Sequence, residues 1–157
     1  MRLSTVLLIP AALGLVSMAA CNLQGAQTSA LAPTTTASSH VLLFSDDGSN
    51  AKLALAESPA TLMLECAHGT GRVHVTHAST GAPQAVLTLA SGSTRDDLRA
   101  DRQAFEGQTL VLGESQSNAP ALSAFRRSGR LQVSYAGQGL AADAQPEAFF
   151  AACERRS

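Results

Sequence analysis

From His40 onward, short apolar runs with a two-residue period alternate with groups of turn residues. The runs at 40–45 and 51–56 flank DDGSN, and this Asp-Gly signal predicts a hairpin. The runs at 60–67 and 71–77 flank HGTG and predict a second hairpin. Four more runs have the same character: 83–91, 108–115, 121–128 and 130–137.

No long helical pattern separates these runs, which argues against a βαβ fold. The sequence predicts an all-β domain, an antiparallel sandwich or barrel of about eight short strands with a C-terminal α-helix. The charged stretch TRDDLRADRQAF (94–105) fits an exposed edge strand, whose charges block pairing with other chains, or a short helix. The sequence leaves both alternatives open.

At the C-terminal end, QPEAFFAACERR (145–156) changes to a helical period. Pro146 suits the first helical position and Glu147 suits the first turn. Phe149 and Cys153 are one turn apart and share a face. We predict a terminal helix with Cys153 facing the core.

The first twenty residues have the layout of a secretory signal. A basic start at Arg2 precedes eleven uncharged, mostly apolar residues (Val6 to Val16), and small residues follow before Cys21. As a helix, the apolar run would span about 16 Å, roughly half of the hydrocarbon core of a bilayer. We therefore expect a signal peptide at 1–20 rather than a transmembrane anchor.

The stretch MAAC (18–21) resembles the lipobox of bacterial lipoproteins. This resemblance implies cleavage before Cys21 and three fatty chains on the new N-terminus. Three chains would anchor the protein stably to a membrane. Asn22 in place of Asp implies, by resemblance to enterobacterial sorting, the outer membrane facing the periplasm. The alternative is a plain secretory signal in which Cys21 is incidental.

Between the anchor and the first strand, residues 21–39 carry no charge, no aromatic ring and no periodicity. We predict a flexible tether with a reach of roughly 25 Å. Residues 40–157 then form the β-rich domain with its C-terminal helix. This division places one folded domain at the end of a lipid anchor.

Three cysteines occur in the chain, and lipidation would consume Cys21. In the run at 60–67, Cys66 shares the apolar face with two leucines. An oxidising compartment then favours a disulfide between Cys66 and Cys153, with two free buried thiols or a metal pair as the alternatives. No CxxC motif or Cys/His cluster surrounds either cysteine, so we predict no metal site.

Other candidate chemistry is weak. His68, His74 and His77 are close in sequence, but His74 and His77 are an odd number of residues apart and point to opposite strand faces, so we predict exposed strand histidines. GESQS around Ser115 has one of the two glycines that a nucleophile elbow needs. DDGSN (46–50) is explained by the hairpin turn. We predict no catalytic residue, no cofactor and no enzyme activity.

The formal net charge of −1 at pH 7 argues against a nucleic-acid partner. Within FRRSGR (125–130), Arg126, Arg127 and Arg130 have no acidic neighbour and are a possible contact for an anionic ligand, such as lipid phosphate or peptidoglycan carboxylate. A polar turn between two strands is the alternative explanation.

The expected function is a non-enzymatic, membrane-anchored envelope lipoprotein that binds an unknown envelope protein or cell-wall component. The alternative is an inhibitor of a cell-wall-degrading enzyme such as lysozyme, because lipobox, small β-domain and one disulfide are similar in layout to membrane-bound lysozyme inhibitors. Their inhibitory-loop motif is not found in this sequence; SGRLQVSY (128–135) has the wrong spacing. Residues 125–153 also resemble uncharacterised proteobacterial envelope proteins with no assigned activity.

Overall fold

The computed structural model describes residues 40–57 and 61–155, and these residues form ten strands and two helices. The elements in chain order are β1 (His40–Asp46), β2 (Asn50–Leu55), β3 (Leu62–Ala67), β4 (Arg72–Ala78), β5 (Val86–Ser91), β6 (Thr94–Arg99), β7 (Asp101–Phe105), β8 (Gln108–Gln116), α1 (Pro120–Ser128), β9 (Arg130–Tyr135), β10 (Gln138–Asp143) and α2 (Glu147–Glu154). The domain is mostly β, as predicted.

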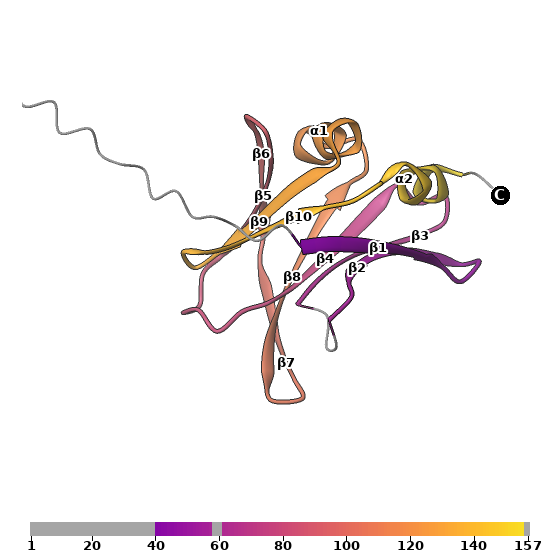
Figure 1. Ribbon diagram of the computed structural model, residues 1–157. Coiled ribbons are helices and arrows are strands. Elements are labelled where there is room, and N and C mark those ends of the chain that lie inside the picture. The colour runs from indigo at the N-terminus through magenta and orange to yellow at the C-terminus, as the bar shows by residue number, and fades with distance from the viewer. Residues whose placement is uncertain (1–39, 58–60, 156–157) are drawn as a thin grey trace, which may run out of the picture. The chain divides into compact units, whose positions relative to one another are not determined.

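All ten strands belong to one sheet in the order β6-β5-β9-β10-β1-β2-β3-β4-β8-β7, which curls into a nearly closed barrel (Figure 1). Neighbouring strands are antiparallel except β1 and β10, which run parallel over two pairs, His40↔Ala142 and Val41↔Asp143. This short contact joins two halves of the sheet. We call β6, β5, β9 and β10 half A, and β1, β2, β3, β4, β8 and β7 half B.

The barrel closes through side-chain packing between β8 and the β5–β6 pair. A Cβ atom on Gly113 of β8 would lie 3.0 Å from Leu98 Cδ1 and 3.1 Å from Leu87 Cδ2. Glycine at this position therefore lets half B approach half A closely.

Both predicted hairpins are confirmed. In the first, β1 pairs with β2, and the Asp47 carboxylate accepts hydrogen bonds from the backbone N–H groups of Ser49 (2.9 Å) and Asn50 (2.7 Å). These bonds hold the pKa of Asp47 below its usual value. In the second, β3 pairs with β4 on either side of the HGTG turn.

The strand predicted at 121–128 is wrong, because this segment is α1. Pro120 lies in the first helical turn, where its missing N–H costs nothing. Leu122 and Phe125 are buried on one face at helical spacing. Gly129 ends the helix in the left-handed conformation (φ 70°), and its N–H donates to the Phe125 carbonyl at 2.8 Å. FRRSGR is accordingly a helix end rather than a turn between strands.

The stretch at 94–105 forms strands, so the edge-strand alternative is correct. It contains two strands rather than one, and β6 and β7 are the two outer edges of the whole sheet. The structure also contains β10, which was not predicted from the sequence. Its small residues lack a clear apolar alternation. The strand predicted at 121–128 is lost, and β6, β7 and β10 are added. The total therefore rises from the eight predicted strands to ten.

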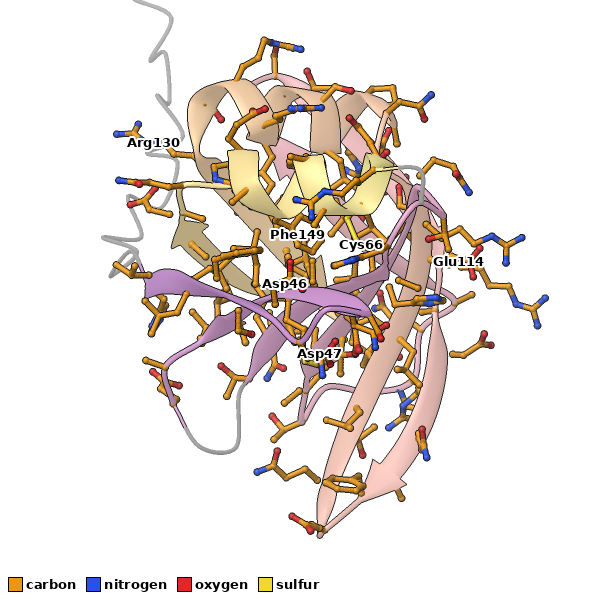
Figure 2. The ribbon with its side chains drawn as sticks, turned by 90° about the vertical axis from the view of Figure 1, so that its right-hand side faces the viewer. Asp46, Asp47, Cys66, Glu114, Arg130 and Phe149 are labelled. Atoms are coloured by element: carbon orange, nitrogen blue, oxygen red, sulfur yellow. A yellow bond between two sulfur atoms is a disulfide. The ribbon has the colours of Figure 1, made fainter. Side chains whose placement is uncertain are left out.

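The C-terminal helix α2 and its inward-facing Cys153 are as predicted. A disulfide joins Cys153 to Cys66 of β3, with their Cα atoms 5.7 Å apart. The backbone N–H of Gly71, in the β3–β4 turn, donates to the Cys153 carbonyl at 3.0 Å. Figure 2 shows Cys66 and Phe149 on the side of α2 that faces the strands. The last helix is therefore fixed to one hairpin by a covalent bond and a hydrogen bond.

Both helices complete the same hydrophobic core. α1 packs against β5, β6 and β9, and α2 packs against β2. The buried ring of Phe150 contacts Phe149 edge-to-face, with centroids 5.3 Å apart, and contacts Phe125 of α1 at 6.1 Å. Within the described part of the chain, neither helix has the length and apolarity needed to cross a bilayer.

Candidate functional site

The three arginines singled out in the sequence contact different parts of the fold. Arg126 of α1 binds two carboxylates of α2, with Nη2 2.8 Å from Glu147 Oε1 and Nη1 3.0 Å from Glu154 Oε2. Its guanidinium also lies 5.5 Å from the centroid of the Phe150 ring. These contacts raise the pKa of Arg126 and lower the pKa of Glu147. Arg126 thus holds α1 to α2, and its fork of donors is already engaged.

Arg127 and Arg130 are exposed. Arg130 begins β9, and its Nε lies 3.7 Å from Oδ1 of Asp143 in β10, which is a loose ion pair. Arg130 is the member of the predicted trio that borders a surface hollow. The anionic-ligand contact remains a prediction, and the geometry favours Arg130 for it.

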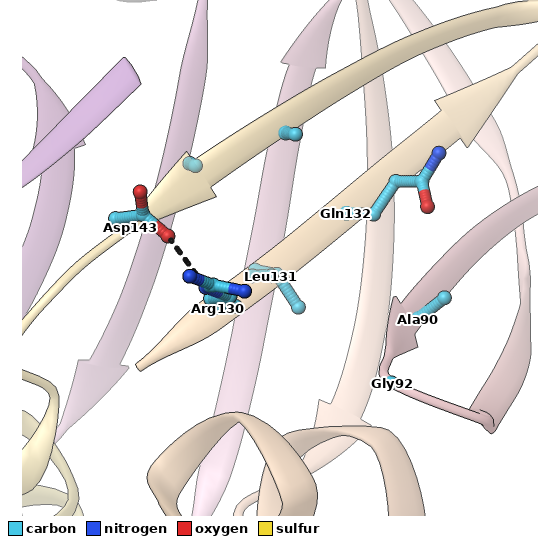
Figure 3. A pocket seen from close by; sticks show the side chains of 8 residues that line it. Ala90, Gly92, Arg130, Leu131, Gln132 and Asp143 are labelled. Carbon is cyan, nitrogen blue, oxygen red and sulfur yellow. Dashed lines mark ion pairs between the residues drawn. The ribbon is translucent and has the colours of Figure 1, made fainter. Parts of the chain in front are cut away.

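This hollow lies on half A and measures about 450 Å³ (Figure 3). We call it the outer trough. Its lining residues come from β5, the turn after it, β9 and β10: Ala90, Gly92, Arg130, Leu131, Gln132, Ala141, Ala142 and Asp143.

The trough exists because small residues flank a longer polar one. In the sheet register, Gln132 of β9 lies between Ala90 of β5 and Ala141 of β10. The alanine methyl groups leave space on both sides of the Gln132 side chain. One row further along, Ser134 lies between Thr88 and Gly139. These side chains are short or absent, so the adjoining surface is polar and does not rise above the backbone of the sheet.

Charges lie at both ends of this surface. Arg95 of β6 is the register neighbour of Ala90, and its Nε binds Asp97 Oδ1 at 2.9 Å. The hydrogen bond from Arg95 keeps the pKa of Asp97 below its usual value. Arg130 and Asp143 form the second, looser pair. The outer trough therefore offers guanidinium, carboxylate and amide groups to one ligand, which suits recognition of a polar molecule with charges of both signs.

The histidines do not all behave as predicted. His74 and His77 point to opposite faces of β4, as expected. His74 is exposed, and its Nδ1 lies 3.9 Å from Oε2 of Glu114. His77, however, is buried, and its Nδ1 lies 3.2 Å from the Thr61 carbonyl oxygen. Burial lowers the pKa of His77. The prediction of exposure is wrong for His77 because its face of β4 is the core face.

His68 is partly buried, with Nε2 3.0 Å from Asp46 Oδ1. Among residues 40–57 and 61–155, no three His, Cys, Asp or Glu side chains are grouped as a metal ion would require.

A set of apolar side chains on the outer face of half B was not predicted from the sequence. We call these residues the outer apolar band: Val41, Leu43, Ala54, Met63, Ala78, Leu110 and Leu112. The signal that could have found it was two runs of consecutive apolar residues, 41–44 and 110–112. A strand with one solvated face does not need such runs.

The predicted signal peptide, Cys21 and the tether lie outside the described residues. No protein family, curated protein or solved structure matches this chain. The geometry of the domain and the chemistry of its sequence are therefore the basis for a functional proposal.

Proposed function

We propose that the protein is a non-enzymatic lipoprotein of the bacterial cell envelope that binds a polar cell-wall component through the outer trough. The disulfide between Cys66 and Cys153 is the observation that supports this proposal most directly. Disulfides persist in the periplasm and outside the cell, whereas cytosolic thiols are kept reduced. An extracytoplasmic compartment is also what the signal-like segment at 1–20 predicts.

The anchor in this proposal is the thiol of Cys21. Three fatty chains at that residue would make dissociation from the membrane negligible, since two already give stable attachment. Asn22 favours the outer membrane, with the domain in the periplasm. Residues 21–39 then place the domain within roughly 25 Å of the lipid surface.

The ligand class follows from the groups in the outer trough. Arg130 can donate to a carboxylate, Asp143 can accept from an amine, and Gln132 can do both. Peptidoglycan stem peptides carry carboxylates, amines and amides together. Such a peptide fits the mixed charge of the trough better than a polyanion does.

Co-sedimentation with purified peptidoglycan tests this assignment. We expect Arg130→Gln to weaken binding at least about tenfold, since a hydrogen bond to a charged group contributes about 1.5 to 3 kcal/mol. Arg127→Gln is the matched control because it removes the same charge from an exposed position outside the trough. Equal effects of the two substitutions, or no effect of either, would contradict a ligand in the trough.

A second function, inhibition of a cell-wall-degrading enzyme, has one structural feature in its favour. The β7–β8 hairpin projects beyond the rest of the sheet (Figures 1 and 2), and Phe105 near its tip is 49% exposed. Glu106 and Gly107 both have positive φ (47° and 80°), which matches a tight two-residue hairpin turn. A preorganised convex element with one aromatic side chain suits insertion into a cleft.

Lysozyme assays distinguish the two functions. If the protein is an inhibitor, the secreted domain lowers lysozyme activity and Phe105→Ala restores it. If the protein is a cell-wall binder, lysozyme activity on a soluble oligosaccharide substrate is the same with and without the domain.

A further inference from the structure

We propose that the outer apolar band of half B rests on the lipid surface of the membrane to which the protein is anchored. This inference rests on the proposed lipid anchor, because the anchor supplies the membrane. It adds a second contact, made by the folded domain, and so assigns an orientation.

The band is continuous across neighbouring strands. The sheet register places Leu43 of β1 beside Ala54 of β2, and Ala54 beside Met63 of β3. The same row continues through Thr76 of β4 to Leu112 of β8. In the next row, Ala78 lies beside Leu110. Apolar and uncharged side chains thus cross five strands without a charged interruption.

The row on the other side of the band is polar and mostly charged. It runs through Ser45, Lys52, Glu65, His74 and Glu114, again as direct register neighbours. Lys52 and Glu65 form an ion pair at 3.4 Å. The outer face of half B is therefore divided along the strand direction into an apolar part and a polar part. A protein that lies in a membrane interface needs this division.

Half A shows that the band is not a general property of the sheet. Outward positions of half A carry Thr88, Gln132 and Ser134 among small residues such as Ala90 and Ala141, with Arg95 on the edge strand. Val86 of β5 is one large apolar side chain exposed on half A, at 42%. In half B, Val41 and Leu43 are 59% and 55% exposed, although Leu42 between them already faces the core. The other five members of the band are half-buried. Contiguous apolar side chains that remain accessible to solvent, with a polar rim, mark an interaction surface.

Lipid is the occupant that the chain connection favours. β1 begins at His40, so the tether joins the domain directly beside Val41, at one end of the band. An acyl anchor on Cys21 would keep the band within the tether's reach of the bilayer. A short tether of this kind gives an effective concentration of about millimolar, so a weak apolar contact is enough for occupancy.

The charges near the band argue for apolar insertion rather than attraction to anionic lipid. The neighbouring row contains Lys52, Glu65 and Glu114, and two further carboxylates border the band directly: Asp143 beside Val41 and Asp101 beside Leu112. These charges do not form a basic patch. We therefore expect the contact to form on zwitterionic phosphatidylcholine and to change little with salt.

The chain has no tryptophan, so one introduced tryptophan is a unique fluorescent probe. With Cys66 and Cys153 joined in a disulfide, Cys21 of the mature chain (residues 21–157) is the single free thiol. A maleimide phospholipid can attach this thiol to phosphatidylcholine vesicles, whether or not the cell acylates it. Failure of the contact is then distinguishable from failure of the proposed anchor.

In these vesicles we expect emission from the Leu43→Trp variant to shift to the blue and to lose at least half of its intensity with brominated lipid. Gln132→Trp, on the outer face of half A, is the matched control and should change little. Equal quenching of both variants, or of neither, would overturn the proposal. A blue shift of Leu43→Trp in the unattached chain together with a dimeric mass would also overturn it, since a second copy would then cover the band.

Discussion

At the scale of single residues, Gly129 shows how one backbone conformation determines the junction between α1 and β9. Its φ of 70° lies in the left-handed region, and an added Cβ would lie 2.7 Å from the Ala144 carbonyl oxygen. That carbonyl belongs to the segment leading to α2, so one position constrains three elements. Both the backbone conformation and the space exclude a side chain at this position.

We expect Gly129→Ala to destabilise the domain more than Gly92→Ala. Gly92 also has positive φ (60°), but a Cβ there would meet nothing within 4 Å. The control should lose about 1 kcal/mol for its left-handed backbone alone. Gly129→Ala should lose at least about 1 kcal/mol more because of the overlap with Ala144. Urea denaturation followed by circular dichroism measures both, and equal losses would contradict the close approach.

The residue scale also shows why some chemistry could not be predicted. That His74 and His77 face opposite sides of a strand follows from spacing alone. Which of the two faces is buried depends on the packing of β4 inside the barrel. Arg126 binds the carboxylates of Glu147 and Glu154. These two residues lie about twenty to thirty positions further along the chain and become its neighbours only when α1 packs beside α2.

At the scale of elements, α2 depends on attachments to partners in other elements, and two of them involve side chains. Its eight residues are too few for a stable isolated helix. The disulfide to β3 and the ion pairs from Arg126 of α1 hold it against the sheet. Each attachment gives a separate prediction.

Cys66→Ser should release α2 before the rest of the domain. We expect a loss of about 2 to 5 kcal/mol in the free energy of unfolding, as is typical for a native disulfide. Native-state hydrogen exchange should show the largest gain in rate at residues 147–154. The Cys66→Ser/Cys153→Ser double variant controls for the reactivity of a lone thiol. Unchanged exchange in α2 would contradict its role as a clipped helix.

Arg126→Gln should lower the melting temperature at pH 7, and this difference should shrink at low pH. The pKa of Glu147 is lower in the folded state than in the unfolded chain, so the ion pair stabilises the fold above the unfolded value of about 4.5. This stabilisation is lost as the pH falls through the folded pKa. Arg127→Gln is the control, and a difference that is equal at pH 7 and pH 3 would exclude the ion pairs as its source.

The elements that local pattern could predict are those with one clear apolar face. β2, β3 and β4 alternate plainly, and both of their hairpins carry turn signals. The segment at 121–128 misled because Leu122 and Phe125 suit a helix while its short apolar run also suits a strand. β10 lacks large side chains, so its place in the sheet depends on its partners β9 and β1.

At the scale of the whole molecule, the two candidate surfaces depend on strand order. The outer trough needs β9 between β5 and β10, although β5 lies about forty residues earlier in the chain. The outer apolar band needs β4 beside β8, which are separated by β5, β6 and β7 in sequence. Arg130 could be found from the sequence but the hollow around it could not, because register between distant strands is set by the closed core.

The outer apolar band lies on half B and the outer trough on half A, and the two surfaces meet where Val41 of the band is the register neighbour of Asp143 of the trough. We propose that half B meets the lipid while half A presents the trough to the cell wall, with the disulfide keeping the last helix in place. This arrangement requires that the chain leaves the cytoplasm and is held at Cys21. Intact-mass spectrometry of the protein purified from envelopes tests that requirement most directly.

We expect a mature polypeptide that begins at Cys21, carries a diacylglyceryl group and a further acyl chain, and is two hydrogens lighter for one disulfide. A polypeptide with no acyl mass at Cys21, or one that begins at another residue, would contradict membrane anchoring through this thiol.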